Sequence, residues 1–215
     1  MAGSFPGQTG GDQRRYLALE MRGRCSMCGI SMPRGKPVYG IFNCAEGRDA
    51  LSEAEKHPGG VYVRFSHPGS MHRSCAIYSA MVCPYLRHRR ARRHRLRPWE
   101  IRRGRAEVLG FDHRGIGFFT ETPTNASDNR AWAYFGLAES IPYGSWRELW
   151  PLYDDAIAAD GKIIDYSSRL HWTDSQEDQN RLAYLSSVDR ATVARMRATA
   201  TTAMGGYVYR LAVLA

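Results

Sequence analysis

The sequence predicts an α+β protein in which a small cysteine-containing module precedes a mixed α+β domain with a short antiparallel sheet and two or three helices. All five cysteines of the 215-residue chain lie before residue 84. Ten arginines are concentrated in residues 87–105, and from residue 106 onward strand-like and helix-like patterns alternate without any cysteine. We therefore expect a flexible tail at 1–15, the cysteine module at 16–86, a basic arm at 87–105 and the α+β domain at 106–215.

The bulk composition favours a globular, cytoplasmic protein. With 43% apolar residues the chain can bury a real core. No stretch approaches the roughly 18 to 20 apolar residues that span a bilayer, so we expect no membrane partner. The N-terminus lacks the apolar segment of a signal peptide. In the cytosol, cysteines are more often metal ligands or free thiols than disulfides.

Two cysteine-containing pairs in the module have the spacing of metal ligands. Cys25-x-x-Cys28 is followed by Gly29, which permits the positive φ that turns backbone N–H groups toward the sulfurs. His72 and Cys75 are three residues apart at the start of a predicted short helix, so both face one side of its first turn. Four ligands of this composition favour a structural, tetrahedral zinc ion without an open position, and the arrangement is treble-clef-like.

Other ligands remain possible from the sequence. His67 is the best substitute for His72, and Cys44 could reach the ion from the intervening loop. Cys83 lies eight residues beyond Cys75, about 12 Å along a helix, which is too far to share the ion. The simpler alternative is a set of reduced structural thiols. Several methionines near the cysteines hint at a soft-metal or redox role, although methionine more often fills a small core.

The motifs RCSMCG, MHRSCAIYSAMVCPYL and, more loosely, ELWPLYDDAIAADGKIID resemble small, largely uncharacterised zinc-binding proteins of actinobacteria and their phages. In that family a Cys-x-x-Cys pair is followed by His-x-x-Cys-Ala and then by Cys-Pro-x-Leu. The resemblance covers the cysteine module best. It implies zinc and a phage or actinobacterial setting, and it implies no activity.

The basic arm carries all of the net charge of +9. Residues 87–105 contain one acid, and the rest of the chain has 20 basic and 20 acidic residues. The composition suits nucleic-acid backbones, with Tyr85 and Trp99 as flanking stacking faces. An acidic protein surface or a plain solvated linker are the alternatives. The predicted nucleic-acid-binding residues are Arg87, Arg89, Arg90, Arg92, Arg93, Arg95, Arg97, Arg102, Arg103 and Arg105.

The last part of the chain has recognisable strand and helix signals. AEVLGFDHRGIGFF predicts two short strands around a turn at 112–115, and AWAYFGLA predicts another strand. Ser145-x-x-Glu148 has capping-box spacing before a helix that stops at Gly161. Further helices are expected near 174–186 and 189–203, the second with Asp189 as its N-cap, and YVYRLAVL predicts a final strand.

The sequence identifies no reaction, and it favours a protein that is not an enzyme. The strongest enzymatic alternative is a nuclease of the HNH kind, which uses a general-base His and a bound divalent ion. Asp112-His113, with Asn125 and Asn129 downstream, resembles that motif superficially, but it follows the cysteine module where such nucleases have it inside. We therefore expect a zinc-stabilised nucleic-acid-binding accessory or regulatory protein of a phage or plasmid. A zinc-stabilised adaptor for another protein is the second interpretation.

Overall fold

The computed structural model describes residues 13–42, 44–56, 61–64, 69–87, 106–119, 130–204 and 208–214. Within these ranges the protein is α+β, as the sequence predicts. Of the basic arm only its first residue, Arg87, belongs to the described part, so the other nine predicted nucleic-acid-binding arginines and Trp99 lie outside it.

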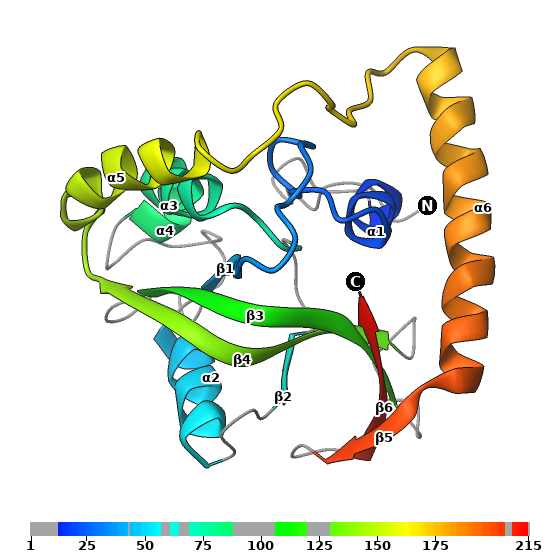
Figure 1. Cartoon of the computed structure of the whole chain (residues 1–215), viewed down its shortest axis with the longest axis horizontal. Coiled ribbons are helices and arrows are strands. Elements are labelled where there is room, and N and C mark those ends of the chain that lie inside the picture. Colours follow the sequence, from blue (N-terminus) through cyan, green and yellow to red (C-terminus); the bar gives the residue numbers. More distant parts are fainter. Residues whose placement is uncertain are drawn as a thin grey trace, which may run out of the picture.

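A six-stranded antiparallel sheet forms the centre of the molecule (Figure 1). Its path runs β2-β4-β3-β6-β5, and β1 pairs with β3 off this path. The long strands β3 and β4 pair along most of their length, with a register shift at Gly110/Phe111. The strands are β1 (Val38–Phe42), β2 (Val61–Arg64), β3 (Ala106–Phe119), β4 (Arg130–Tyr143), β5 (Thr201–Met204) and β6 (Val208–Leu214).

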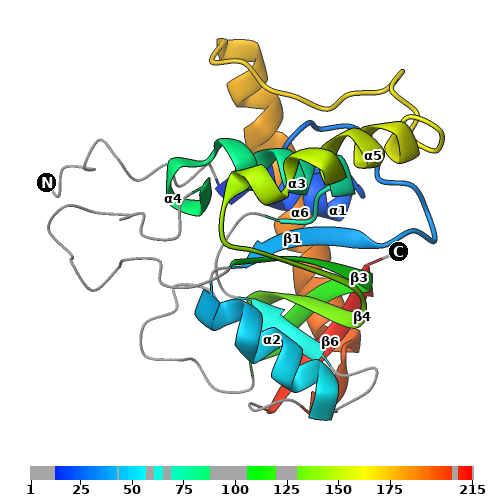
Figure 2. The ribbon, with the colours of Figure 1, turned by 90° about the vertical axis from the view of Figure 1, so that its left-hand side faces the viewer.

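Helices pack on both sides of this sheet, with α3 and α5 on one side and α2 on the other (Figure 2). The long α6 runs beside α1 at one edge of the molecule (Figure 1). The helices are α1 (Gln13–Met21), α2 (Cys44–Lys56), α3 (Arg73–Val82), α4 (Pro84–Arg87), the short 3-10 helix η2 (Trp146–Glu148), α5 (Trp150–Asp160) and α6 (Gln176–Thr199).

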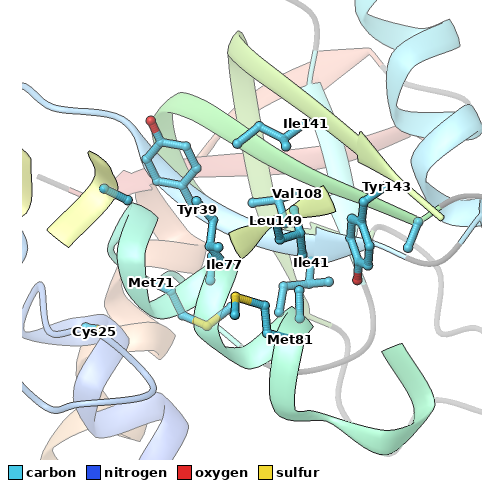
Figure 3. Close-up of a cluster of buried hydrophobic side chains, with 14 residues drawn as sticks. Cys25, Tyr39, Ile41, Met71, Ile77, Met81, Val108, Ile141, Tyr143 and Leu149 are labelled. Carbon is cyan, nitrogen blue, oxygen red and sulfur yellow. The ribbon is translucent and has the colours of Figure 1, made fainter. Parts of the chain in front are cut away.

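The alternation of side chains along the strands produces two cores. On β1, Tyr39 and Ile41 contribute to one core, whereas Val38 and Phe42 contribute to the other. This is the period of two expected for a strand with both faces covered. Figure 3 shows the first core, in which residues of α3 meet residues of the sheet and Leu149.

The sheet and both cores cross the boundaries predicted from composition. Strands β1 and β2 come from the predicted module, yet they pair with β3 and β4 of the predicted C-terminal domain. In Figure 3, Ile77 of α3 lies near Val108 of β3. The cysteine module and the C-terminal part are therefore joined through backbone hydrogen bonds and shared apolar packing.

Three element predictions are corrected. The expected turn at 112–115 is wrong, because β3 continues through these residues and pairs with β4 on one side and β6 on the other. The expected pair of helices is the single α6, with Ser175 as its N-cap. Asp189 lies inside α6 because its buried carboxylate pairs with Arg22 at 2.9 Å and needs no helix end. The sequence analysis also missed α1 and α2.

Among the described residues, no helix combines the length and apolar character needed to cross a membrane.

Candidate metal centre

The first pair of sulfur ligands lies in a tight hairpin between residues 24 and 31. Arg24 and Ser31 pair as an isolated antiparallel bridge, and the Cys25 amide donates to the Ile30 carbonyl at 2.9 Å. The Gly29 amide donates back to the Cys25 carbonyl at 2.9 Å. We call residues 25–29 the knuckle. Its backbone bonds hold Cys25 and Cys28 on the same side of a single turn.

Gly29 is required at its position for two reasons. Its φ is +73°, a left-handed conformation that side chains disfavour. A Cβ there would also collide with the carbonyl oxygen of Leu170. The Leu170 amide donates to the Gly29 carbonyl at 2.9 Å, so the segment before α6 lies directly against the knuckle.

The second ligand pair lies at the N-terminus of α3. His72 is the N-cap residue with extended dihedrals, and Cys75 follows within the first turn. The knuckle is tied to this helix start by the Ser26 amide, which donates to the Ser70 carbonyl at 2.9 Å, and by the Ser26 hydroxyl, which donates to the Gly69 carbonyl at 3.1 Å. These bonds bring the pair Cys25 and Cys28 next to the pair His72 and Cys75.

Cys25, Cys28, His72 and Cys75 form a group that could hold a metal ion. Their ligand atoms all lie within 4.8 Å of one another. Nδ1 of His72 is 3.5 Å from the Cys28 sulfur and 3.8 Å from the Cys75 sulfur. Cys25 and His72 are buried, and Cys28 and Cys75 are half-buried. These four residues are the predicted ligand set, and the structure brings all four together.

The side chains of the cluster shift one another's pKa values through hydrogen bonds. Hydrogen bonds with Cys25 and Cys75 lower the pKa of Cys28, whereas hydrogen bonds with Cys25 and Cys28, together with burial, raise the pKa of Cys75. Burial by itself would lower the pKa of His72, but hydrogen bonds with the Cys25 and Cys28 sulfurs raise it to about 10. Three thiols this close cannot all ionise unless a cation balances their charge.

A hydrogen bond also orients the histidine ring. Nε2 of His72 lies 3.0 Å from the Ser31 carbonyl oxygen, which can only accept, so the proton of a neutral ring resides on Nε2. The Nδ1 lone pair then faces the sulfurs. Such a carbonyl partner behind the ring is the usual way in which a ligating histidine is held in one tautomer.

Asp160, at the end of α5, completes the N-terminus of α3. Because the His72 ring faces the cysteines, its side chain makes no capping bond to this helix. Instead, the buried Asp160 carboxylate accepts from the Ser74 amide at 2.9 Å. A carboxylate at this end also interacts favourably with the helix dipole.

A buried ion pair supports the chain just before His72. Glu20 of α1 is 1% exposed, and its carboxylate accepts from the amide and the hydroxyl of Ser70. The guanidinium of Arg114 on β3 lies 2.6 Å from the same carboxylate and donates to the Glu20 carbonyl at 2.7 Å. With its charge paired and its oxygens bonded, Glu20 links α1, the ligand segment and the sheet.

Among the described residues, the alternative ligand Cys83 does not join the cluster. Cys83 is described and half-buried, and it is not a member of the four-residue group. His67 and the side chain of Cys44 lie outside the described part of the chain. Met71 and Met81 are buried in the core next to the knuckle, where they fill space between α3 and the sheet (Figure 3).

The Asp112-His113 pair of the nuclease alternative lies on β3, and both side chains are exposed. The His113 ring contacts the Phe135 ring across the sheet at 5.2 Å. Within the described ranges, neither residue belongs to a group of three or more metal-ligating side chains. Asn125 and Asn129 lie outside those ranges.

Arg87, the first arginine of the basic arm, is held against the fold. Its guanidinium carbon lies 4.7 Å from the centre of the Trp146 ring. Arg87 ends α4, which follows α3 after Cys83. The arm therefore begins at a fixed point a few residues beyond the helix that carries Cys75.

No protein-family model matches this chain, and the searches of curated proteins and of solved structures found no match either.

Sequence reasoning missed the residues that support the centre. Asp160, Glu20 and Arg114 are buried charged residues. Asp160 lies 86 positions from its partner Ser74, and Arg114 lies 94 positions from its partner Glu20. No local spacing marks such partners.

Proposed function

We propose that this protein is a zinc-stabilised nucleic-acid-binding protein with an accessory or regulatory role. The observation that carries the proposal is the start of the basic arm at Arg87, a few residues beyond the end of α3, the helix that carries the candidate ligand Cys75.

The ligand set suits zinc in a structural role. Three thiolates and one imidazole are a common set for a tetrahedral structural zinc ion. With Zn–S near 2.3 Å and Zn–N near 2.0 to 2.1 Å, neighbouring ligand atoms of a tetrahedron lie roughly 3.5 to 3.8 Å apart. The distances of 3.5 and 3.8 Å from His72 Nδ1 to the sulfurs of Cys28 and Cys75 agree with that spacing. Four protein ligands would leave no position for a reacting water.

The charge distribution supports a polyanionic partner. The arm carries ten arginines in nineteen residues, and the remainder of the chain is neutral. Guanidinium groups pair with phosphates and release condensed counterions. The resemblance to actinobacterial and phage zinc proteins leads us to propose a phage or plasmid setting, with the protein acting in the cytoplasm.

The test is the salt dependence of binding to duplex DNA. If about six arginines contact phosphates, the slope of log K against log salt is near −5. Changing Arg89, Arg90, Arg92 and Arg93 to alanine should flatten the slope by roughly 3 to 4 units and weaken binding to all sequences alike. The matched control removes the same charge from exposed positions elsewhere, at Arg34, Arg48, Arg190 and Arg195. Binding that is equally reduced in both variants would show non-specific attraction and refute the arm as the binding element.

A protein adaptor is the second candidate. It is favoured by apolar side chains that are exposed on α3 and α5, among them Val82 and Trp150. This alternative predicts no measurable nucleic-acid binding at low salt, and capture of a protein partner that is lost in the four-arginine variant.

The nuclease alternative predicts magnesium-dependent nicking that disappears in His113→Ala.

A further inference from the structure

A hollow of about 250 Å³ lies beside the metal centre. One wall is the face of α1, the second is the knuckle, and the third is the segment at 169–172 that hydrogen-bonds to Gly29. Cys28 contributes to this lining, so the hollow and the metal centre share a wall. The residues that matter for its chemistry are Arg15, Tyr16, Met27, Arg169, His171 and Trp172.

The lining of this hollow offers hydrogen-bond donors and positive charge. It contains two arginines and a histidine, and no carboxylate. Arg15 Nε and Trp172 Nε1 are buried atoms without a hydrogen-bond partner among the described residues. Arg15 forms a long ion pair of 3.4 Å with the almost fully exposed Asp174, and it does so through Nη2 and not through Nε. An indole N–H can only donate, so a ligand must bring acceptors.

Two aromatic residues, Tyr16 and Trp172, line the hollow. Aromatic side chains are common stacking partners for the bases of single-stranded nucleic acids. The Arg181 guanidinium lies 5.8 Å from the centre of the Trp172 ring and donates to the His171 carbonyl, which fixes this segment. Sites for whole small molecules commonly measure about 300 to 1,000 Å³, so a hollow of this size suits one unit of a larger ligand or a small free ligand.

We propose that this hollow binds one nucleotide unit. Arg15 and Arg169 hold the phosphate, and the base lies against Tyr16 and Trp172, where Trp172 Nε1 donates to one of its acceptors. A free nucleoside monophosphate and one residue of a single strand share this chemistry. The single-strand case rests on the proposed function, whereas the free nucleotide does not. In the strand case the basic arm supplies general affinity, and the hollow supplies a defined contact next to the zinc centre.

The experiment uses the full, zinc-loaded chain with two probes, adenosine 5′-monophosphate and a short single-stranded oligothymidylate. The indole N–H signals of the five tryptophans are followed by proton–nitrogen correlation spectroscopy. Trp172→Phe identifies the signal of the hollow, and Trp150→Phe is the control at an exposed tryptophan outside it. We expect both probes to shift the Trp172 signal and to leave the Trp150 signal unchanged.

Affinities are then measured for Arg15→Gln, Arg169→Gln and Trp172→Phe, with Arg147→Gln as an exposed control outside the hollow. Each hollow variant should weaken binding by roughly fivefold or more, and the control should not. Zinc content and melting are checked in parallel, and Arg169→Gln serves if the Arg15 or Trp172 variant misfolds, because Arg169 is exposed.

The outcomes separate the two proposals. If the oligonucleotide binds tightly but equally to all hollow variants, the hollow is refuted and the nucleic-acid function stands. If the mononucleotide alone binds and depends on these residues, the hollow stands as a free-nucleotide site and its role on a single strand is refuted, while the duplex DNA measurement decides the nucleic-acid function. If neither probe moves the Trp172 signal, the hollow proposal is overturned.

Discussion

At the scale of single residues, each ligand of the metal centre has a defined environment. Cys25, the first residue of the knuckle, has no exposed surface. The His72 ring is oriented by the Ser31 carbonyl so that Nδ1 faces the sulfurs. Losing one ligand would leave charged thiolates and a buried ring without the cation that balances them. We therefore expect that substitution of any one of the four ligands abolishes metal binding altogether.

Cys25→Ser should abolish zinc binding and unfold the region around the centre, because structural zinc supplies on the order of 10 kcal/mol of apparent folding free energy. Elemental analysis and thermal melting measure both effects. Cys83→Ser is the matched control, since Cys83 is a half-buried free cysteine outside the cluster, and it should keep one zinc per chain. Full zinc occupancy in a Cys25→Ser, Cys75→Ser double variant would contradict the assignment.

At the scale of elements, the ligand helix α3 depends on residues from its neighbours. The carboxylate of Asp160 on α5 accepts from the Ser74 amide in the first turn of α3. The carboxylate of Glu139 on β4 accepts from Nε and Nη2 of Arg73, the first residue of α3. The Tyr39 hydroxyl of β1 donates to the same Glu139 at 2.9 Å. The position of His72 and Cys75 therefore follows from how α3 is held against the sheet and α5.

Asp160→Ala should destabilise the protein by about 1 to 2 kcal/mol, the usual cost of losing an N-terminal capping group. It should also speed the release of zinc to a chelator, because the first turn of α3 carries two of the ligands. Urea unfolding and the rate of zinc transfer to a chromogenic chelator measure these effects. The control is Asp155→Ala, at an exposed position of α5, which should change neither the stability nor the rate of zinc release. Equal zinc release from both variants would argue against the cap.

Glu139 should make stability depend on pH. Hydrogen bonds from Arg73, and then from Tyr39, hold its pKa below the ordinary value of 4.5 despite partial burial. A depressed folded-state pKa means that the stabilisation is complete above about pH 4.5 and is lost as the pH falls through the folded-state pKa.

Glu139→Gln should therefore cost about 1 kcal/mol at neutral pH, since the pair is partly exposed, and the difference from the wild type should shrink in acid. Urea unfolding is measured at neutral pH and in acid, each with zinc and with chelator. These four conditions separate the effect of the Glu139 charge from the effect of losing the metal. Glu148→Gln is the exposed control. If the stability difference between Glu139→Gln and the wild type stays constant with pH, ionisation of Glu139 does not contribute to the stability.

At the scale of the whole molecule, the chain folds around one sheet to which both predicted parts contribute. Backbone pairing joins β1 to β3 and β2 to β4, and the ion pair of Glu20 with Arg114 adds a buried link between α1 and β3. These contacts make the metal centre part of the main fold.

A fragment that begins at residue 106 should therefore fail to fold cooperatively, although its composition suggests an independent domain. It would lose two strands of the sheet and would leave Arg114 buried without its carboxylate. Circular dichroism and amide exchange of the fragment test this. In the full chain, chelation of the metal should lower protection in β3 as well as in α3. A cooperative, chelator-insensitive melt of the fragment would instead support the independent domain.

The sequence alone determined the four candidate ligands, the α+β class and the arginine cluster, because each of these follows from short spacings or from composition. Cys25-x-x-Cys28 and His72-x-x-Cys75 are local patterns whose geometry follows from one turn of backbone. Tertiary structure alone decided that β3 runs straight through residues 112–115, that α6 is a single helix, and that Asp160 caps α3. Each of these depends on partners far along the chain: neighbouring strands give β3 its bonds, and Arg22 pairs with Asp189 inside α6. A pattern within one segment cannot encode which distant segment packs against it.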